Sequence, residues 1–124
     1  MRLLIVEDNV GVRGLIKRAL GRLGAEFVEC RDGAEAVKAY AAERPDFVLM
    51  DLKMPVLDGI TATRQIIAAD PSARIIILTN HDHPSLHEAA REAGACGYVL
   101  KENLLALREL ITNLIVSEEK KCEG

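Results

Sequence analysis

The sequence contains carboxylate, hydroxyl and ammonium side chains at the ends of short apolar segments. Five residues share this placement: Glu7, Asp8, Asp51, Thr79 and Lys101. Three carboxylates brought close together repel one another, and Mg²⁺ relieves that repulsion while it keeps open positions for a phosphoryl oxygen. An ammonium and a hydroxyl can bind the same phosphoryl group, and an aspartate can attack phosphorus to form an acyl phosphate. The residue types therefore indicate Mg²⁺-assisted phosphoryl chemistry.

Each of these residues also has a commonplace interpretation. A Glu–Asp pair after a strand usually caps a helix or lies in a solvated loop, and a single aspartate, threonine or lysine at a strand end is less informative still. The pattern matters because the five residues belong to four different apolar segments. A functional site therefore requires a fold that brings the ends of those segments together.

The hydrophobic pattern predicts such a fold. Short apolar segments typical of buried strands lie at 3–6, 25–30, 47–50, 74–79 and 96–100, and each is followed by a segment of helical periodicity. Five repeats of strand and helix predict an α/β domain with a parallel sheet covered by helices on both faces. Right-handed crossovers place the carboxyl ends of all the strands at one edge of the sheet, where ligands bind. The five residues are therefore expected to meet at that edge.

The composition is that of one globular domain. The chain has 124 residues, of which 49% are hydrophobic and 28% charged, and its net charge is −3 at pH 7. This size suits a single domain, and we expect it to cover residues 1–118, with a polar tail at 119–124. The apolar runs at 3–6 and 75–78 are too short to span a bilayer, so no membrane association is expected. The small negative charge argues against direct nucleic-acid binding by this chain.

The three cysteines show neither a disulfide framework nor a zinc site. Cys30, Cys96 and Cys122 are odd in number and far apart. Cys30 and Cys96 are predicted to be small buried residues, and Cys122 to be exposed in the tail. The first residues do not have the pattern of a secretory signal. We therefore expect a reducing, cytoplasmic environment.

A second group of potential metal ligands lies between the fourth predicted strand and the next helix. Its members are His81, Asp82, His83 and His87. A proline interrupts the group and no cysteine lies near it, so solvated imidazoles are favoured over a transition-metal site. The pattern Ser85-x-x-Glu88 predicts a capping box at the start of this helix.

Four segments resemble the motifs of response-regulator receiver domains of bacterial two-component signalling. They are Leu4–Asn9 (LIVEDN), Leu49–Gly59 (LMDLKMPVLDG), Ile77–Thr79 (ILT) and Gly97–Lys101 (GYVLK). The resemblance covers essentially the whole chain. It implies a (βα)5 flavodoxin-like domain with a single doubly wound, five-stranded parallel sheet in strand order 2-1-3-4-5.

The resemblance also implies roles for the residues at the sheet edge. Asp51 would accept a phosphoryl group from a phosphohistidine of a sensor histidine kinase or phosphotransfer protein. The side chains of Glu7, Asp8 and Asp51 and the backbone carbonyl of Lys53 would bind Mg²⁺. Lys101 would pair with Asp51 before the reaction and with the phosphoryl group after it. The chain would then be a signalling module that assists its own phosphorylation and dephosphorylation, not a turnover enzyme.

A conformational switch is implied by the same resemblance. Thr79 would turn towards the phosphoryl group, and Tyr98 would follow into the space that it leaves. This movement would alter the surface formed by the fourth helix, the fifth strand and the fifth helix, which controls a partner or an effector domain. The first helix, residues 10–23, is the expected docking surface for the kinase.

The subgroup and the partners are less constrained by sequence. Thr79–His81 together with Gly97–Lys101 resembles the NarL-type subgroup, whose members usually carry a C-terminal helix-turn-helix. No such module follows here, so the chain is interpreted as a single-domain regulator or as a receiver without its effector. Leu105 and Leu110 add apolar surface to the last helix, which suggests a possible homodimer.

Other functions of an α/β domain fit less well. An aspartyl-phosphate phosphatase of the haloacid-dehalogenase kind needs an acid two residues after its nucleophile, where this chain has Lys53. A flavin site needs a hydroxyl- and glycine-rich loop where Glu7 and Asp8 stand, and no phosphate-binding loop of a nucleotide hydrolase is present. The remaining alternative is a phosphorylation-independent binding module on the same fold.

Overall fold

The computed structural model describes residues 1–54 and 56–123, with side chains to residue 117. Within these residues, strands and α-helices alternate five times, as predicted. The strands are β1 (Arg2–Val6), β2 (Glu26–Cys30), β3 (Phe47–Met50), β4 (Ile75–Thr79) and β5 (Gly97–Leu100). The helices are α1 (Val10–Leu20), α2 (Gly33–Glu43), α3 (Gly59–Ala69), α4 (Pro84–Ala93) and α5 (Leu104–Glu123), with a 3₁₀-helix, η1 (Gly21–Leu23), after α1.

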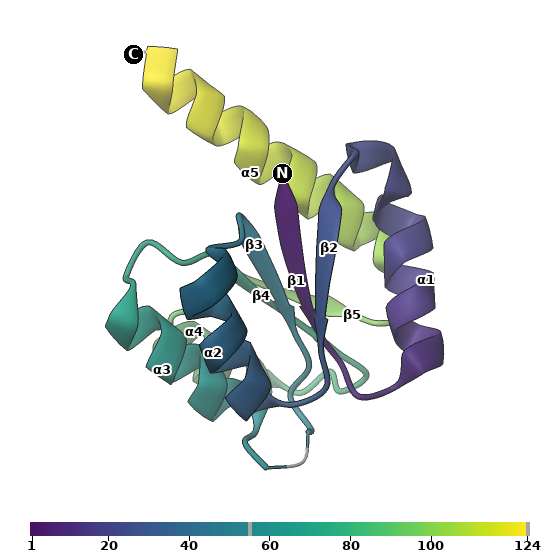
Figure 1. The fold of residues 1–124 in the computed structure, drawn as a ribbon, viewed down its shortest axis with the longest axis vertical. Coiled ribbons are helices and arrows are strands. Elements are labelled where there is room, and N and C mark those ends of the chain that lie inside the picture. The colour runs from purple at the N-terminus through teal and green to yellow at the C-terminus, as the bar shows by residue number, and fades with distance from the viewer. Residues whose placement is uncertain (55, 124) are drawn as a thin grey trace.

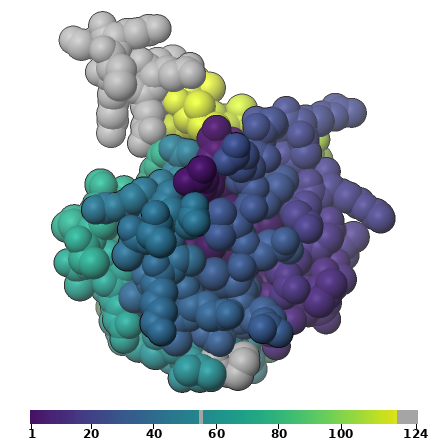
Figure 2. Space-filling view, in the orientation of Figure 1, coloured from purple at the N-terminus to yellow at the C-terminus, as the bar shows by residue number. Residues whose placement is uncertain are grey.

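The strands form one parallel sheet in the order β2-β1-β3-β4-β5, which confirms the predicted topology. In Figure 1, α1 and α5 lie on one side of the sheet, and α2, α3 and α4 lie on the other. In the space-filling view, α1 in purple and α2 in blue occupy neighbouring regions of the visible face (Figure 2). The carboxyl ends of the strands therefore meet at one edge, between the two helical layers.

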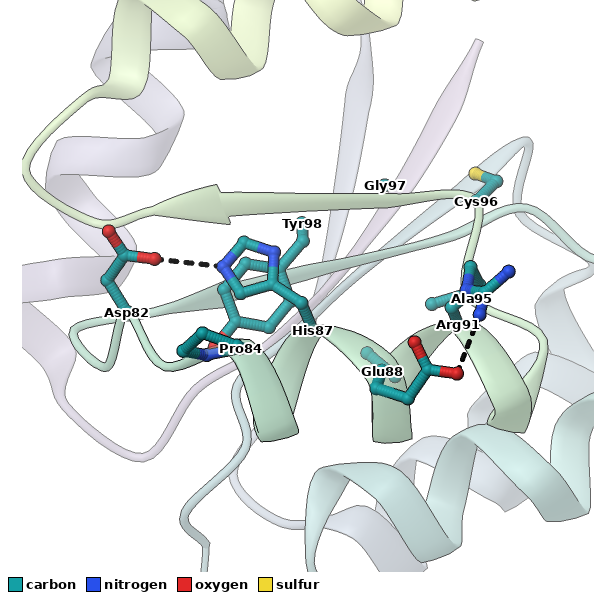
Figure 3. A pocket seen from close by; sticks show the side chains of 10 residues that line it. Asp82, Pro84, His87, Glu88, Arg91, Ala95, Cys96, Gly97 and Tyr98 are labelled. Carbon is teal, nitrogen blue, oxygen red and sulfur yellow. Dashed lines mark hydrogen bonds and ion pairs between the residues drawn. The ribbon is translucent and has the colours of Figure 1, made fainter.

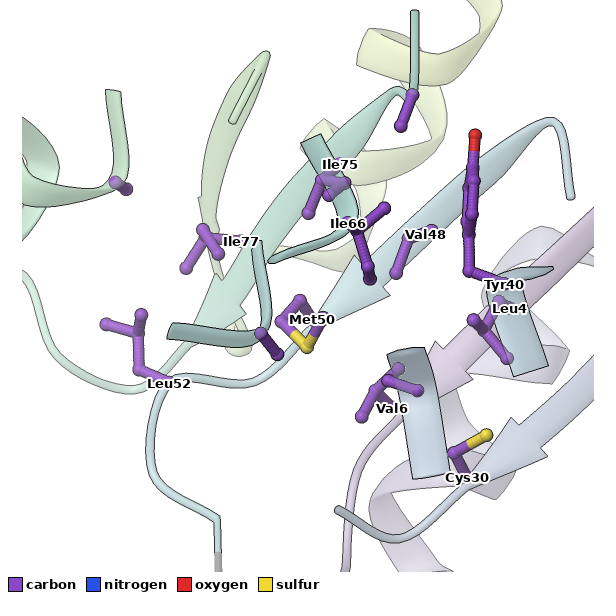
Figure 4. Packing of buried hydrophobic residues seen from close by; sticks show 14 residues of the cluster. Leu4, Val6, Cys30, Tyr40, Val48, Met50, Leu52, Ile66, Ile75 and Ile77 are labelled. Carbon is purple, nitrogen blue, oxygen red and sulfur yellow. The ribbon is translucent and has the colours of Figure 1, made fainter. Parts of the chain in front are cut away.

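The core consists of two apolar clusters, one on each face of the sheet. The cluster beneath α2, α3 and α4 includes Val6, Met50 and Ile77, and it is drawn in Figure 4. The cluster beneath α1 and α5 includes Ile5 and Leu49 from the same strands. Every residue of β3 and β4 is buried, as expected for strands covered on both faces. This double coverage fixes the strand ends rigidly.

Side-chain caps begin two helices immediately after the loops that carry acidic residues. Asn9 Oδ1 accepts from the amide of Val12 at 3.0 Å and caps α1. Asp58 Oδ1 accepts from the amide of Thr61 at 2.9 Å and caps α3 in the same way. The loops after β1 and β3 are therefore held at both ends.

The structure corrects the prediction for one cysteine, and another cysteine side chain lies outside the described residues. Cys30 is buried at the end of β2, but Cys96 is exposed because it precedes the edge strand β5; the prediction for Cys96 was wrong. Leu110 is half-buried beside β5, whereas Leu105 is 55% exposed. The side chain of Cys122 lies outside the described residues. Among the described residues, no helix combines the length and apolar content needed to cross a membrane.

Asp70 connects α2 to the segment between α3 and β4. Its Oδ2 accepts from the Tyr40 hydroxyl at 2.7 Å and from Arg44 Nη1 at 3.2 Å, and its Oδ1 accepts from the amide and hydroxyl of Ser72. Hydrogen bonds from Ser72 and then from Tyr40 lower the pKa of Asp70 from 3.8 to about 2. The ionised carboxylate is therefore favoured by the folded state.

This pKa shift predicts how stability depends on pH. Because the native state keeps Asp70 ionised to lower pH than the unfolded chain does, its contribution is complete above the unfolded pKa and is lost as the pH falls towards 2. We expect Asp70→Asn to lower the free energy of unfolding at neutral pH. The difference in this free energy between the variant and the parent is expected to narrow between about pH 5 and about pH 3. Urea unfolding across this range measures the difference. A difference that stays constant would contradict the prediction.

Candidate functional site

Two adjacent strands deliver the acidic residues to one point. In the register of β1 and β3, Val6 pairs with Met50, so the next residues, Glu7 and Asp51, emerge side by side. The hydrogen bond from the Asp51 amide to the Val6 carbonyl, at 3.1 Å, extends the pairing by one residue. Carboxylate oxygens of Glu7, Asp8 and Asp51 lie within 4.8 Å of one another. Glu7 and Asp51 are buried and Asp8 is exposed, so the cluster opens to solvent on one side.

Lys101 supplies the positive charge in this cluster. Its Nζ lies 2.6 Å from Glu7 Oε2 and 3.2 Å from Asp51 Oδ2. The Lys101 backbone is held beside β4 by the hydrogen bond from its amide to the Thr79 carbonyl at 2.8 Å. The lysine side chain therefore reaches from the edge strand past β4 to the ends of β1 and β3. Four of the five residues singled out from the sequence therefore lie together: the carboxylates of Glu7, Asp8 and Asp51, and Lys101, which contacts two of them.

The charges at the site influence one another. Burial raises the pKa of Glu7, the hydrogen bond from Lys101 opposes that rise, and the charge of Asp51 adds to it. Burial lowers the pKa of Lys101, but the hydrogen bond to Glu7 and the charge of Asp51 outweigh this effect, so its pKa is raised overall. Lys101 therefore remains an ammonium, and the site holds a cation matched to two buried carboxylates.

The loop after β3 is closed tightly around Asp51. Asp51 Oδ1 accepts from the amide of Leu52 at 2.8 Å, and the Leu52 carbonyl accepts from the amide of Gly59 at 3.0 Å. A Cβ added to Gly59 would lie 2.0 Å from the Asp51 carbonyl oxygen. The first residue of α3 therefore packs directly on the backbone of Asp51. Lys53 is exposed on the same loop, and the predicted use of its carbonyl as a metal ligand stays a prediction.

The two predicted switch residues are joined through the backbone of His81. Thr79 is fully buried, and its Oγ1 accepts from the His81 amide at 3.3 Å. The Tyr98 hydroxyl donates to the His81 carbonyl. A movement of the Thr79 side chain would therefore act on the same residue that holds Tyr98.

Tyr98 lines a groove of about 550 Å³ between α4 and β5. Its ring stacks on His87 with centroids 3.8 Å apart, and His87 Nε2 lies 2.9 Å from Asp82 Oδ1. Figure 3 shows the His87 ring lying over Tyr98, with the Asp82 carboxylate at the edge of the imidazole. Part of the surface predicted to change on phosphorylation is therefore concave and contains the predicted switch tyrosine.

His83 and His87, two of the potential metal ligands between β4 and α4, each contact another residue of the same segment. His83 Nδ1 accepts from the amide of Ser85 at 3.2 Å and caps α4, while His87 pairs with Asp82. The predicted capping box is therefore wrong, because the helix begins at Pro84 and His83 is its cap. Among the described residues, the one group of His, Cys, Asp or Glu side chains with converging ligand atoms is Glu7, Asp8 and Asp51.

Arg13 contacts the loop that carries Glu7 and Asp8, and the sequence analysis did not identify this contact. Its Nη1 donates to the Glu7 carbonyl at 2.7 Å, and its Nε donates to Glu29 Oε1 at 3.1 Å. The available signal was its position one turn after the cap Asn9, because helical side chains lean towards the N-terminus of the helix. The position of Arg13 on the helix does not by itself identify the Glu7 carbonyl as the acceptor of its hydrogen bond.

The comparisons with known proteins agree on the class of protein. Residues 3–114 match the family described as response regulator receiver domain. Chemotaxis protein CheY of Bacillus subtilis (strain 168) is 42% identical over 101 residues, which is 81% of this chain and 84% of that protein. Response regulator MprA of Mycobacterium avium (strain 104) is 36% identical over 114 residues, which is 92% of this chain and 49% of MprA. The chain thus spans about half the length of the MprA relatives that it matches.

Solved structures give the same result. A two-component response regulator of the LuxR family from Aurantimonas sp. SI85-9A1 has a TM-score of 0.87 and 38% identity, covering 94% of this chain and 85% of that one. The receiver domain of the regulator NarL from Mycobacterium tuberculosis has a TM-score of 0.84 and 28% identity, covering 91% and 94%. The described residues of this chain likewise form a five-stranded parallel sheet, with an acidic cluster and a lysine at one edge. The chain belongs to the response regulator receiver domain family.

Proposed function

We propose that this chain accepts a phosphoryl group on Asp51 from a phosphohistidine in a Mg²⁺-dependent reaction. The observation that carries the proposal is the position of Lys101 Nζ between Glu7 and Asp51, with Asp8 beside them. A lysine and three acidic residues in this arrangement are suited to bind both a divalent cation and the oxygens of a phosphoryl group. Membership in the receiver family supports the same chemistry.

The donor set fits Mg²⁺. The ligand atoms are carboxylate oxygens, which this hard cation prefers, and the exposed side of the cluster leaves room for water and substrate oxygens. Glu7, Asp8, Asp51 and the Lys53 carbonyl would hold the ion. When bound, Mg²⁺ would neutralise charge on the transferring phosphoryl group.

The chain's own residues would carry the transfer. An Asp51 carboxylate oxygen forms the new O–P bond while the P–N bond to the donor imidazole breaks, and the imidazole leaves with the bonding electron pair. Lys101 then exchanges its contact with Asp51 for one with a phosphoryl oxygen. Thr79 donates its hydroxyl proton to another phosphoryl oxygen, and Tyr98 follows it.

The output would pass through the surface of α4, β5 and α5. The groove beside Tyr98 is part of that surface, and a change in the position of Tyr98 would alter its shape. A partner or effector domain that binds one shape better than the other would shift the equilibrium between them. The partners we propose are a sensor histidine kinase or phosphotransfer protein in the cytoplasm and, through the exposed Leu105, a second copy of this chain.

Assignment to the NarL-type subgroup is the finer proposal. It is supported by the likeness to the LuxR-family regulator and to the NarL receiver domain, although MprA and CheY also match. The absence of a DNA-binding role for this chain is proposed from its net charge of −3.

Intact-protein mass after incubation with Mg²⁺ and acetyl phosphate tests the proposal. We expect one added phosphoryl group in the parent and none in Asp51→Asn, or in the parent without Mg²⁺. Asp58→Asn is a matched control, because Asp58 caps α3 outside the cluster. It is expected to leave phosphorylation intact. Labelling of Asp51→Asn to the parent's extent would contradict the proposal.

The alternative, a phosphorylation-independent binding module, makes the opposite prediction. Such a module would gain no mass with acetyl phosphate and would not bind beryllofluoride, an analogue of the phosphoryl group, in the presence of Mg²⁺. Binding of beryllofluoride with no mass gain would still support a receiver whose phosphoryl group is transferred or lost quickly. A parent protein that neither gains mass with acetyl phosphate nor binds beryllofluoride would favour the phosphorylation-independent binding module.

A further inference from the structure

We propose that Arg13 is a positioning residue that sets the affinity of the acidic site for Mg²⁺ by holding the loop that carries Glu7 and Asp8. This inference deepens the proposed function and rests on it. The residue lies on α1, outside the set of carboxylates and the lysine, and it touches none of the proposed ligand oxygens among the described contacts.

Arg13 binds two elements at once. Its Nη1 donates to the Glu7 backbone carbonyl at 2.7 Å, and its Nε donates to Glu29 Oε1 on β2 at 3.1 Å. The Arg13 side chain is 13% exposed, whereas that of Lys17, one turn further along α1, is 40% exposed. Arg13 is therefore packed between the helix, the edge strand and the loop after β1.

The hydrogen bond to the Glu7 carbonyl orients Asp8. The carbonyl of Glu7 and the amide of Asp8 belong to one rigid peptide plane. Fixing that carbonyl fixes one of the two peptide planes that flank the Asp8 Cα and thereby restricts the directions open to the Asp8 side chain. The Glu7 carboxylate is held separately, by the Asn9 amide at 3.2 Å and by Lys101 at 2.6 Å. We therefore expect the placement of Asp8, the exposed member of the cluster, to depend on Arg13 more than that of Glu7 does.

Two effects of Arg13 on a bound cation oppose each other. Its hydrogen bond holds the loop ready for binding, which strengthens affinity, whereas its positive charge repels a divalent cation. Glu29 lies 3.1 Å from the Arg13 guanidinium and offsets much of that charge. The positioning effect therefore dominates, and loss of Arg13 weakens cation binding.

A calorimetric titration with Mg²⁺ measures this effect in the parent, Arg13→Ala and Lys17→Ala. Lys17 is the matched control, because its Nζ lies 3.3 Å from the other oxygen of the same Glu29 carboxylate. It has the same charge but no described contact with the loop. Arg13→Ala is expected to raise the Kd for Mg²⁺ about tenfold, as removal of an outer contact to a metal ligand does. Lys17→Ala is expected to leave the Kd within about twofold of the parent.

A second readout distinguishes positioning from general stability and needs no metal. Hydrogen exchange of the Asp8 and Asn9 amides in the metal-free protein is expected to become faster in Arg13→Ala but not in Lys17→Ala, and by more than any loss of global stability in urea unfolding accounts for. Equal Kd values for the two variants, or equal exchange in both, would overturn the inference. If the parent itself fails to bind Mg²⁺, the proposed function fails, and the exchange comparison still decides whether Arg13 holds the loop.

Discussion

Gly59→Ala is expected to destabilise the protein by roughly 3 kcal/mol, because overpacking against fixed atoms is costly. The added Cβ would lie 2.0 Å from the Asp51 carbonyl oxygen, 2.9 Å from the Asp51 carbonyl carbon and 3.0 Å from the Leu52 Cα. All three neighbours are backbone atoms at the end of a buried strand, so no side chain can rotate away. The first turn of α3 would have to move off β3, and Asp51 would move with it.

Urea unfolding of Gly59→Ala and of a matched control measures this cost. Gly14→Ala is the control, because Gly14 lies within α1 and its added Cβ would have no heavy atom within 4 Å. Alanine favours a helix over glycine, so this variant is expected to gain up to about 1 kcal/mol. The same glycine-to-alanine substitution is thus expected to lower the free energy of unfolding at position 59 and to raise it at position 14. A Gly59→Ala variant as stable as the parent would show that α3 does not pack on Asp51 as described.

Lys101→Met is expected to slow phosphorylation by about 100-fold at saturating Mg²⁺, the usual cost of removing one group that stabilises transition-state charge. The same substitution is expected to tighten Mg²⁺ binding. Lys101 Nζ lies 2.6 Å from Glu7 and 3.2 Å from Asp51, so its charge competes with a cation at that cluster. Opposite effects on binding and on rate would separate the two roles of the lysine.

The rate of mass gain with acetyl phosphate and a Mg²⁺ titration test the two effects. Lys38→Met is the control, because Lys38 is exposed on α2 and the substitution removes the same charge at a residue outside the acidic cluster. It should behave as the parent does in both assays. An undiminished rate in Lys101→Met would exclude a role for Lys101 in the transfer, and weaker Mg²⁺ binding would show that the lysine supports the ion.

The fold was predictable because its signals are periodic and redundant. Runs such as Leu3–Val6 and Phe47–Met50 are apolar throughout, as strands covered on both faces must be, and amphipathic segments separate them. The residues of the site follow from the same logic, because a residue directly after a parallel strand is placed at the sheet edge by the strand itself. The placement of Glu7, Asp51 and Lys101 at that edge therefore follows from the sequence pattern.

The contacts that sequence did not reveal depend on tertiary geometry. Arg13 reaches a backbone carbonyl, and every residue offers one, so residue type does not identify the acceptor. The exposure of Cys96 depends on β5 being the edge strand, and the cap of α4 depends on which nitrogen of His83 faces the helix. Each of these features requires the position of a second element, which a local pattern does not contain.

The main chain of His81 links Thr79 to Tyr98 without using the imidazole. Thr79 Oγ1 uses an acceptor site for the His81 amide, so the hydroxyl proton remains for another partner. Tyr98 uses the His81 carbonyl. Because both contacts involve main-chain atoms of His81, a change of its side chain removes neither hydrogen bond. Proline, which lacks the amide hydrogen, is the exception. We therefore expect substitutions of His81 other than proline to keep both main-chain hydrogen bonds.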